Sequence, residues 1–387
     1  MKKNMKKMFI LFLVIGLFLI ITSGCSKPAE PGGNGETKLP TIITTMSYDV
    51  GTYPQIDYIG ERILEKHGIS LRIIPSSTAV ARHYPVRLKE AEMAMTGVDG
   101  WLMQEGIYEY SDRSWGPQPI RIIWFGTSLG FAPGVTADSN IHTVADLKGA
   151  RIATYVGADA ITLYKKAYLA FANIDIDDVK LVPVSGLYTP YDMALAGDDI
   201  VFLAMPQAFK ATEMAASPRG IRYLELPHDD LEGWARLKAV HPEMVPYTFD
   251  WGAGIDKPLQ LSSASSPRIL TYDWLDDEIA YFMTKVIHEE YDVIAAKDLT
   301  FKKLWDMDTN LHLFKEGTNP FHPGTIRYLK EINVWTDELE VLQQERLQRQ
   351  EDLKKLWVQV TEEADKKVLK AGEFPPFWLE KRAAAGF

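Results

Sequence analysis

The cysteine content constrains this chain most, because Cys25 is the only cysteine among its 387 residues. A single thiol cannot form a disulfide within the chain, so burial of apolar side chains must stabilise the fold. Hydrophobic residues make up 46% of the sequence. The roughly 340 residues beyond position 40 exceed what one hydrophobic core usually holds, so the sequence predicts two lobes.

The segment that precedes Cys25 is typical of an export signal. Four lysines among the first seven residues are followed by an uncharged apolar run, residues 8–21, which is too short to span a bilayer comfortably. The small residues 22–24 and then Cys25 resemble a bacterial lipobox, in which the thiol is acylated before cleavage. This resemblance implies that residues 1–24 are a signal peptide. A lipid such as palmitate on Cys25 would then anchor the exported protein to the cell membrane, facing the periplasm or the cell exterior. An ordinary membrane anchor with an incidental cysteine is the alternative.

Removal of the signal would leave an acidic chain. The formal net charge of −10 becomes −14 without the four lysines of the signal. Nucleic acid and anionic lipid surfaces would repel such a chain, so neither is an expected partner. Residues 25–40 are mainly Pro, Gly and polar residues, and they are expected to form a flexible tether before a globular body that begins at Thr41.

Beyond the tether, short apolar segments alternate with segments of helical periodicity. This alternation favours α/β layers around a largely parallel sheet. Strands are expected at residues 41–46, 69–75, 92–96, 120–127, 151–156, 180–184, 200–204, 221–226 and 268–272. Helices are expected at residues 55–67, 98–106, 160–172, 192–196, 206–216 and 276–290, with one more that ends near residue 90.

The last fifty residues have a different pattern. Residues 336–369 carry apolar side chains at helical spacing between Glu, Gln, Arg and Lys, which predicts one long amphipathic helix. The heptads are irregular, so packing along one lobe is favoured over a dimeric coiled coil. The apolar stripe consists of Leu339, Leu342, Leu353, Leu356, Trp357, Val360 and Ala364.

Four segments carry a resemblance to a known family. Residues 50–54 (VGTYP) resemble a first loop after strand one, and residues 144–152 read VADLKGARI. Residues 277–285 (DEIAYFMTK) precede a fourth segment, residues 321–331 (FHPGTIRYLKE). In this order, between residues 41 and 334, the segments resemble the TAXI family, the solute-binding receptors of one class of TRAP transporters.

The resemblance implies an α/β fold of the two-lobed periplasmic-binding-protein type (type II), with hinge crossovers between lobes that close on a small solute. Lobe one would comprise residues 41–135 with 256–335, lobe two residues 136–255, and residues 336–387 would form a C-terminal helical extension. Such a receptor would have no catalytic activity, cofactor or metal. It would deliver a small carboxylate-bearing solute, an amino acid or an organic acid, to TRAP-type membrane permease subunits. A receptor for another permease or a sensor is one alternative, and a surface-tethered enzyme resembling pyrimidine-precursor synthases is another.

Candidate ligand-binding residues follow from this fold, because solutes bind beyond the carboxyl ends of parallel strands. The candidates are hydroxyl, aromatic, amide and charged side chains near the ends of expected strands, one glycine, and one tryptophan near the return crossover. They are Ser47, Tyr48, Thr52, Tyr53, Ser76, Ser77, Thr78, Arg82, Asp99, Tyr155, Gly157, Asp159, Gln207 and Trp251.

Arg82 is the basic side chain near the early loops, and it is the candidate for pairing with a carboxylate of the solute. The loops depart from the family pattern by adding carboxylates, and Asp49, Asp99 and Asp159 could face the amino group of a zwitterionic solute. Each candidate also has a structural alternative. Arg82 could be a surface residue, Thr78 a helix cap and Asp99 a favourable charge at a helix N-terminus, while the tyrosines could be packing residues.

Catalytic and metal-binding patterns are missing from the sequence. No nucleophile elbow, phosphate-binding loop or dinucleotide motif occurs where a strand meets a helix. The eight histidines are scattered without metal-ligand spacing, and His322 is expected to have a structural role in a turn. Trp251 could stack on a sugar ring, although scattered tryptophans are mostly packing residues.

Overall fold

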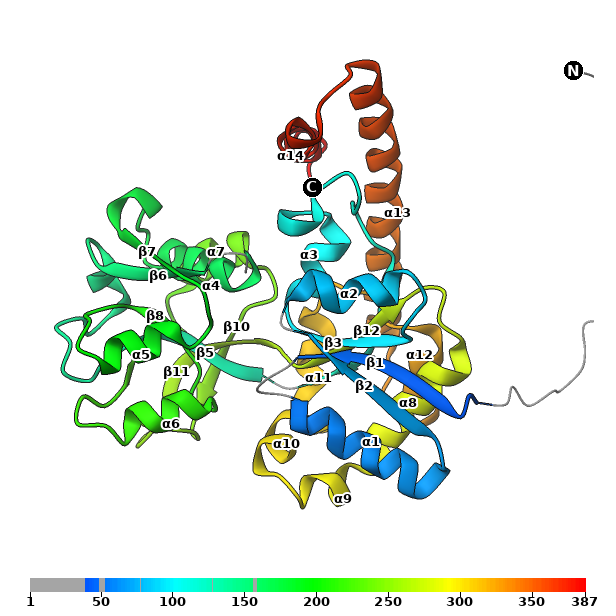
Figure 1. Cartoon of the computed structure of the whole chain (residues 1–387), viewed down its shortest axis with the longest axis horizontal. Coiled ribbons are helices and arrows are strands. Elements are labelled where there is room, and N and C mark those ends of the chain that lie inside the picture. Colours follow the sequence, from blue (N-terminus) through cyan, green and yellow to red (C-terminus); the bar gives the residue numbers. More distant parts are fainter. Residues whose placement is uncertain (1–38, 49–52, 77, 127, 156–158) are drawn as a thin grey trace, which may run out of the picture. The chain divides into compact units, whose positions relative to one another are not determined.

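The computed structural model describes residues 39–387 with the exception of 49–52, 77, 127 and 156–158 (Figure 1). The predicted signal peptide, the lipidation candidate Cys25 and most of the tether therefore lie outside the described residues. Within the described part of the chain, no helix is both long and apolar enough to cross a membrane. The fold class is α/β, as expected, with strands in mixed sheets and many helices.

A five-stranded sheet, called here the first sheet, has the order β2-β1-β3-β12-β4 (Figure 1). β1 pairs in parallel with β2 and β3, whereas β12 runs antiparallel to both β3 and β4. The parallel pairs bring the carboxyl ends of β1, β2 and β3 to one edge, where the ligand-binding loops of α/β proteins gather. The strands are β1 Ile42–Ser47, β2 Ser70–Pro75, β3 Met93–Thr96, β4 Ile120–Phe125 and β12 Arg268–Tyr272.

The helices that accompany the first sheet bury apolar stripes. In α1 (Tyr53–His67), the side chains of Ile56, Ile59 and Ile63 are fully buried, and their spacing of three and four residues places them on one helical face. The other helices are α2 Ala79–Arg87, α3 Asp99–Glu105, α8 Asp277–Glu289, α9 Tyr291–Ala295, α10 Leu299–Leu304, α11 Met307–Glu316 and α12 Pro323–Glu331, with a 3₁₀ turn at Tyr108–Tyr110.

The predicted helix start at Asp276 is confirmed, and His322 begins another helix. Asp276 caps α8 by accepting a hydrogen bond from the N–H of Glu278 at 2.8 Å. The Nδ1 atom of His322 accepts a hydrogen bond from the N–H of Gly324 at 3.2 Å and so caps α12. Its Nε2 must then carry the proton, which it donates to the carbonyl oxygen of Leu275 at 3.1 Å. The structural role predicted for His322 is therefore confirmed.

A second sheet has the order β10-β11-β5-β8, with β9 paired to β5, and all of these pairings are antiparallel. β6 and β7 pair in parallel, and a bridge between Ile152 and Val201 connects them to the segment before β8. The prediction of a largely parallel sheet is wrong here, because β5, β10 and β11 lie in segments with Gly, Pro or Ser and without a clear strand pattern. The strands are β5 Ser128–Val135, β6 Arg151–Tyr155, β7 Lys180–Val184, β8 Phe202–Ala204, β9 Arg222–Tyr223, β10 Val245–Phe249 and β11 Leu259–Ser265.

The helices between these strands pack on the second sheet and on one another. α4 (Asp159–Phe171) contacts β5, β6 and β8, and it packs along α7 (Leu231–Val240). Tyr164 and Tyr168 of α4 are buried in this contact region. The remaining elements are α5 Thr189–Leu195, α6 Phe209–Ala215 and the 3₁₀ turns Val144–Leu147 and Ile176–Asp178.

The chain passes between the two sheets from β4 to β5 and returns from β11 to β12. The two passages touch, since the N–H of Gly126 donates to the carbonyl oxygen of Pro267 at 2.6 Å. A Cβ at position 126 would lie 2.3 Å from that oxygen, so this approach requires glycine. The lobe boundaries stay a prediction, and the pairing of β5 with β11 in the second sheet favours assigning both strands to lobe two.

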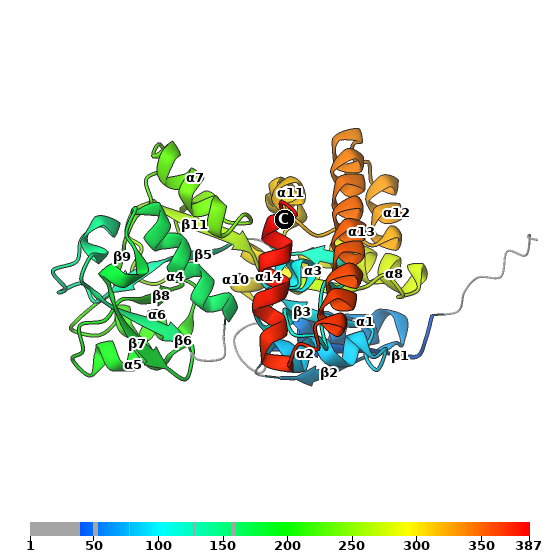
Figure 2. The ribbon, with the colours of Figure 1, turned by 90° about the horizontal axis from the view of Figure 1, so that it is seen from above.

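The C-terminal extension, residues 336–387, forms a helical hairpin. α13 (Asp337–Lys366) confirms the predicted long helix, and a 3₁₀ turn (Ala371–Glu373) leads into α14 (Phe374–Ala384). Figure 2 shows α14 lying beside α13, and α13 also contacts α3 and α11. The distal part of the hairpin has a small apolar cluster of its own, made of Leu353, Val360, Ala364, Phe374 and Trp378.

The buried face of α13 is only partly the predicted apolar stripe. Between Leu339 and Leu353, the buried side chains are Gln343, Arg346 and Gln350. Gln343 exchanges two hydrogen bonds with the backbone of Phe321, at 2.8 and 2.9 Å. Polar side chains are tolerated there because the facing segments present backbone groups that need partners.

Candidate functional site

The edge where β1, β2 and β3 end gathers aromatic and charged side chains. Tyr48 follows β1, Arg82 belongs to the helix after β2, and Asp99 opens the helix after β3. The guanidinium of Arg82 lies 3.9 Å from the centroid of the Tyr48 ring, close enough for a cation–π contact. The structure therefore brings together three of the predicted site residues. We call these three residues, together with Thr96 and His83, the Arg82 cluster.

Arg82 is buried beside an acidic partner. Its side chain is 3% exposed, and its Nη2 lies 3.7 Å from Oδ2 of Asp99, a long ion pair. Nη1 donates to the carbonyl oxygen of Ser76 at 3.2 Å. Its Nε is also buried and has no hydrogen-bond partner among the described residues. A buried guanidinium with an unused donor is suited to binding an anion.

A hydrogen-bonded chain orders the rest of the Arg82 cluster. The hydroxyl of Thr96 donates to Oδ2 of Asp99 at 3.2 Å, and Nε2 of His83 lies 3.0 Å from the same hydroxyl oxygen. Burial and then the charge of Arg82 hold the pKa of His83 well below its usual value, so the imidazole is neutral. Because the Thr96 proton is engaged with Asp99, Nε2 of His83 must be the donor. Burial raises the pKa of Tyr48 to about 12, so its phenol is also neutral at physiological pH.

A second group of polar side chains lies near the return passage. Arg268 opens β12 and is fully buried, and its two terminal nitrogens donate to Glu243 at 3.1 and 2.5 Å. The imidazole of His241 is also fully buried, with its ring between Trp101 of α3 (6.0 Å between centroids) and Tyr164 of α4 (4.9 Å). Neither ring nitrogen of His241 has a partner among the described residues.

Electrostatics connects this second group to the Arg82 cluster. Desolvation is the largest influence on the phenols of Tyr48 and Tyr164 and raises the pKa of both, and the charge of Arg268 opposes that rise at both. The charge of Arg268 thus acts on the phenol that follows β1 and on the phenol of α4. Burial lowers the pKa of His241 to about 4, so this imidazole is neutral as well.

Gln207 and Trp251 belong to a third group of side chains, separate from the Arg82 cluster and from the group around Arg268. The amide nitrogen and oxygen of Gln207 are both buried without a partner among the described residues. Trp251 stacks on Phe249 at 5.2 Å between ring centroids, and the N–H of Ala253 donates to the carbonyl oxygen of Pro206 at 2.8 Å. That bond holds the Trp251 segment against the start of the Gln207 loop. Across the described part of the chain, no hydrogen bond or ion pair joins this group to the Arg82 cluster.

The other predicted site residues have local structural contacts. The hydroxyl of Ser47 donates a hydrogen bond to the sulfur of Met95 on the neighbouring strand β3, at 3.6 Å. Thr78 caps α2 by accepting from the N–H of Ala81 at 3.3 Å, and Tyr53 is the half-buried first residue of α1. Asp49, Thr52, Ser77 and Gly157 lie outside the described residues, and Asp159 begins α4 but its side chain is not described.

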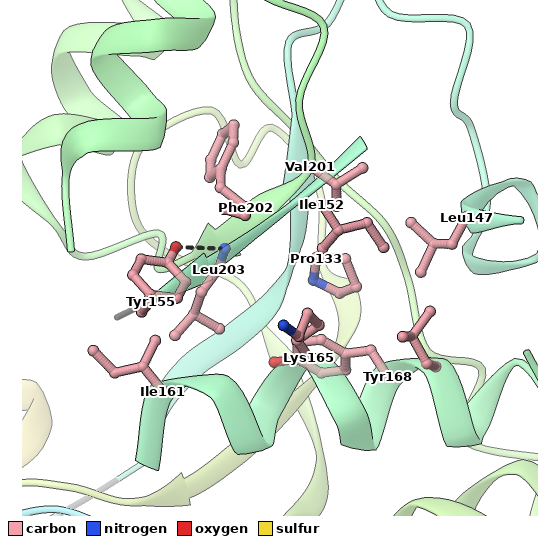
Figure 3. A pocket seen from close by; sticks show the side chains of 12 residues that line it. Pro133, Leu147, Ile152, Tyr155, Ile161, Lys165, Tyr168, Val201, Phe202 and Leu203 are labelled. Carbon is pink, nitrogen blue, oxygen red and sulfur yellow. Dashed lines mark hydrogen bonds between the residues drawn. The ribbon is translucent and has the colours of Figure 1, made fainter. Parts of the chain in front are cut away.

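Tyr155 lines a small cavity between α4 and the strands β6 and β8 rather than an open cleft (Figure 3). The cavity volume is about 20 Å³, room for about one water, and most of its lining is apolar. The hydroxyl of Tyr155 accepts a hydrogen bond from the N–H of Leu203 at 3.3 Å. Lys165 is the charged lining residue, and its Nζ donates to the hydroxyl of Thr154 at 2.7 Å. Burial lowers the pKa of Lys165 to about 8.

Sequence reasoning missed several residues that the structure brings to this region. Arg268 had a usable signal, because a charged residue opening an otherwise apolar strand must find a partner when that strand is buried. His241 and Glu243 precede a strand that the sequence pattern did not indicate, so nothing local marked them. Groups of three or more His, Cys, Asp or Glu side chains able to hold a metal ion are absent from the described residues.

Comparison with solved structures finds distant likenesses to periplasmic binding proteins. The periplasmic aliphatic sulphonate binding protein SsuA from Escherichia coli is 13% identical, with a TM-score of 0.44 over 80% of this chain and 91% of that chain. XAC2383 from Xanthomonas citri, bound to ATP, is 12% identical with a TM-score of 0.42, over 79% and 99%. The probable amino-acid ABC transporter extracellular-binding protein ytmK from Bacillus subtilis is 10% identical with a TM-score of 0.39, over 69% and 98%. At such scores the likeness carries no information about the ligand of this chain.

Comparison with curated protein sequences yields no match. The profile of the NMT1-like family, in contrast, matches residues 53–332, which is well over half of the chain. The matched span begins at α1 and contains Arg82, His83, Thr96 and Asp99 of the Arg82 cluster as well as the Arg268–Glu243 pair. Tyr48 precedes the matched span, and the C-terminal extension follows it. This chain therefore belongs to the NMT1-like family.

Proposed function

We propose that this protein is an exported receptor that captures a small carboxylate-bearing solute, an amino acid or an organic acid, between two lobes. The observation that carries the proposal is the state of Arg82. Its side chain is 3% exposed, its Nε has no hydrogen-bond partner among the described residues, and its Nη2 lies 3.7 Å from the carboxylate of Asp99. A solute carboxylate within hydrogen-bond distance would bind more strongly than Asp99 does at that separation.

The solute class follows from the charges around Arg82. Asp99 beside Arg82 makes the cluster formally neutral, and this favours a solute that brings a positive charge together with its carboxylate. An amino acid would place its carboxylate on Arg82 and its ammonium group toward Asp99, whereas a plain organic acid would leave Asp99 close to a second anion. The ring of Tyr48 would cover one side of the bound carboxylate–guanidinium pair.

Capture requires that the solute bind one arrangement of the lobes better than another. Two chain passages connect the sheets, β4–β5 and β11–β12, and a few residues at such passages are enough to absorb a hinge motion. A solute bound by Arg82 and also by polar groups near the second sheet would stabilise the arrangement in which the two lobes are closed.

The receptor would deliver its solute to TRAP-type membrane subunits, in keeping with the sequence resemblance to the TAXI family. The profile match is to the NMT1-like family as such, so the TAXI assignment stays a prediction. A gene for a large membrane permease of the TRAP class is expected beside the gene for this protein. A neighbouring gene for a permease of another class, or for a sensor kinase, would indicate that the receptor serves that partner instead. Chemical conversion of the solute on overnight incubation would indicate an enzyme.

The binding prediction is tested with the chain from residue 26 onward, unfolded and refolded to remove captured solute and then screened by thermal shift. The panel contains amino acids, dicarboxylates, keto acids, aromatic acids and sugars. A solute at about 100 times its Kd adds about 2.7 kcal/mol to the free energy of unfolding, which raises the Tm by several degrees. A panel without any carboxylate among its hits would contradict the proposal.

Two substitutions then identify the groups that the solute contacts. Arg82→Ala should cost about 2–5 kcal/mol of binding free energy, because the solute carboxylate would be left without its buried partner. Arg72→Ala, which removes an exposed arginine of β2, is the matched control and should leave Kd unchanged. Asp99→Asn separates the solute classes, since it should weaken an amino acid but not a plain carboxylate. Calorimetric titration measures all three.

Lipid anchoring through Cys25 is a separate prediction. In the exporting cell, Cys25→Ser should abolish incorporation of a radiolabelled fatty acid and move the protein from the membrane fraction to the soluble fraction. The physical reason is the loss of acyl chains, each buried CH₂ of which contributes about 0.8 kcal/mol of membrane binding. Ser26→Ala should leave both the label and the fractionation as they are. A Cys25→Ser protein that stays in the membrane would support an ordinary membrane anchor instead.

A further inference from the structure

The helix α3 joins the candidate site to the C-terminal extension. Its first residue, Asp99, faces Arg82, and Trp101, two residues later, stacks on His241 at 6.0 Å between ring centroids. Its last residue, Glu105, faces the extension. A seven-residue helix is too short to be stable by itself, so contacts with its surroundings must hold it in place.

Glu105 is bound from both helices of the extension. Its side chain is 1% exposed, and Arg349 of α13 donates to its two carboxylate oxygens at 2.7 and 2.8 Å. Arg382 of α14 also donates to Oε2. Burial by itself raises the pKa of Glu105, but the two arginines lower it further than burial raises it, so the carboxylate stays charged. This charge fixes the C-terminal end of α3 to the hairpin.

Gln104 extends the connection toward the passage between the sheets. Its Oε1 accepts hydrogen bonds from Gln350 of α13 at 2.9 Å and from Asn319 at 3.2 Å. Asn319 also donates to the carbonyl oxygen of Gly100 in α3 at 3.2 Å and accepts from Arg268 at 3.3 Å. A continuous set of buried hydrogen bonds thus runs from α13 through α3 to the Arg268–Glu243 pair.

The residue after α3 is held by the same extension. The indole N–H of Trp378 donates to the carbonyl oxygen of Gly106 at 2.7 Å, and Trp378 is fully buried in the apolar cluster of the hairpin. The profile match to the NMT1-like family ends at residue 332, so these contacts are made by a part of the chain outside the matched segment. The extension therefore contacts the site helix at its last two residues and at the residue that follows.

We infer that the C-terminal extension positions α3 and thereby sets the placement of Asp99 and Trp101 at the ligand site. Glu105, Arg349, Arg382 and Gln350 are positioning residues in this inference, since none of them touches the Arg82 cluster. The part of the inference that concerns solute affinity rests on the proposed function, whereas the part that concerns the position of Trp101 does not.

The position of Trp101 is monitored in the full chain by NMR, through the chemical shift of the imidazole protons of His241. The spectrum of His241→Gln assigns these resonances. The ring current of a stacked indole shifts the imidazole protons, so displacement of α3 changes their chemical shift. Arg349→Ala combined with Arg382→Ala should move the His241 resonance. Gln350→Leu removes the hydrogen bond to Gln104, together with those from Arg121 and to the carbonyl oxygen of Ile120, and should move the resonance in the same direction. This single variant keeps the inference testable if the double variant does not fold.

Lys381→Ala is the matched control, because Lys381 pairs with Glu363 inside the hairpin and does not touch α3. It should leave the His241 resonance in place even where it lowers the Tm. An unchanged resonance in both the double variant and Gln350→Leu would overturn the inference, since loss of stability alone does not shift the resonances of folded molecules.

Solute affinity gives the second readout. With a solute found in the thermal-shift screen, the double variant should bind about tenfold more weakly, equivalent to about 1.4 kcal/mol, and Arg349→Lys should restore part of that loss. A wild-type protein that binds no solute would contradict the proposed function, and the His241 resonance would still decide the positioning inference. Equal affinity of wild-type and double-variant proteins would overturn the part of the inference that concerns solute affinity while leaving the receptor proposal intact.

Discussion

Replacing Arg268 with methionine is expected to destabilise the folded protein by about 3–5 kcal/mol, because Glu243 would be left charged and buried without its main partner. The side chains are 0% and 2% exposed, and the pair is bidentate at 3.1 and 2.5 Å. Glu243 also accepts from the hydroxyl of Thr318 at 2.7 Å, which is too little to compensate a buried carboxylate. Urea denaturation measures the free energy of unfolding.

A matched control exists on the surface. Arg327 and Glu278 form a pair of the same bidentate geometry, at 2.7 and 2.8 Å, but with side chains 46% and 38% exposed. Arg327→Met should therefore change the free energy of unfolding by at most about 1 kcal/mol. Equal losses in the free energy of unfolding for Arg268→Met and Arg327→Met would show that burial of the Arg268–Glu243 pair does not increase the cost of breaking it.

The pH dependence of the Arg268 effect follows from the carboxyl group. Burial raises the pKa of Glu243, but the charge and hydrogen bonds of Arg268 and the bond from Thr318 bring it below its ordinary value of 4.5. A carboxyl group whose pKa is lower in the folded state stabilises the fold above the unfolded-state pKa, and this contribution is lost as pH falls through the folded-state pKa. The difference between wild type and Arg268→Met should be largest at neutral pH and decrease below pH 4.5.

Lys165→Met is expected to stabilise the protein by about 1–3 kcal/mol at pH 7. Burial lowers the pKa of Lys165 from 10.5 to about 8, and each pKa unit corresponds to about 1.4 kcal/mol of penalty on the charged form. The lost hydrogen bond to Thr154 offsets part of this gain. Methionine has a similar length and would fill the apolar lining that surrounds the amine in Figure 3.

The gain from Lys165→Met should depend on pH in a defined window. Below pH 8 the amine is protonated in both states, so the folded state carries the full desolvation penalty. Between pH 8 and 10.5 the unfolded chain binds more protons than the folded chain, and wild-type stability rises with pH. The advantage of the variant should shrink over that window. Lys166→Met, at the exposed neighbouring position, should change stability by less than about 0.5 kcal/mol, and a gain there equal to that at Lys165 would contradict the argument.

Local sequence patterns predicted many elements of the fold correctly. The helices α1, α4, α8 and α13 agree with expectation within a few residues, because each carries an apolar stripe of helical spacing. The strands β1, β6 and β7 agree as well. The strands β5, β10 and β11 were missed, because residues such as Pro133, Gly134 and Ser262 weaken the local strand pattern, whereas hydrogen bonding to neighbouring strands stabilises these segments in the fold.

The candidate site was predictable only where it follows strand ends. Tyr48, Arg82 and Asp99 were found in this way, since parallel strands end at one edge of a sheet. His241 and Arg268 were not found, because their importance depends on partners supplied by α3, α4 and the segment before β10. Tyr155 follows the same strand-end rule as Tyr48, yet it lines an interior cavity.

The sequence by itself determined the periodic helices, the helix start at Asp276 and the absence of an intramolecular disulfide, because each depends on residues that are near one another or on composition alone. Only the tertiary structure decided which polar side chains are buried. Gln350 looks like a surface residue in any short window, and the apolar strand that follows Arg268 indicates that this arginine needs a partner but not which one. They become interior residues because α13, α3 and β12, which are far apart along the chain, meet and supply the hydrogen bonds that burial of a polar group requires.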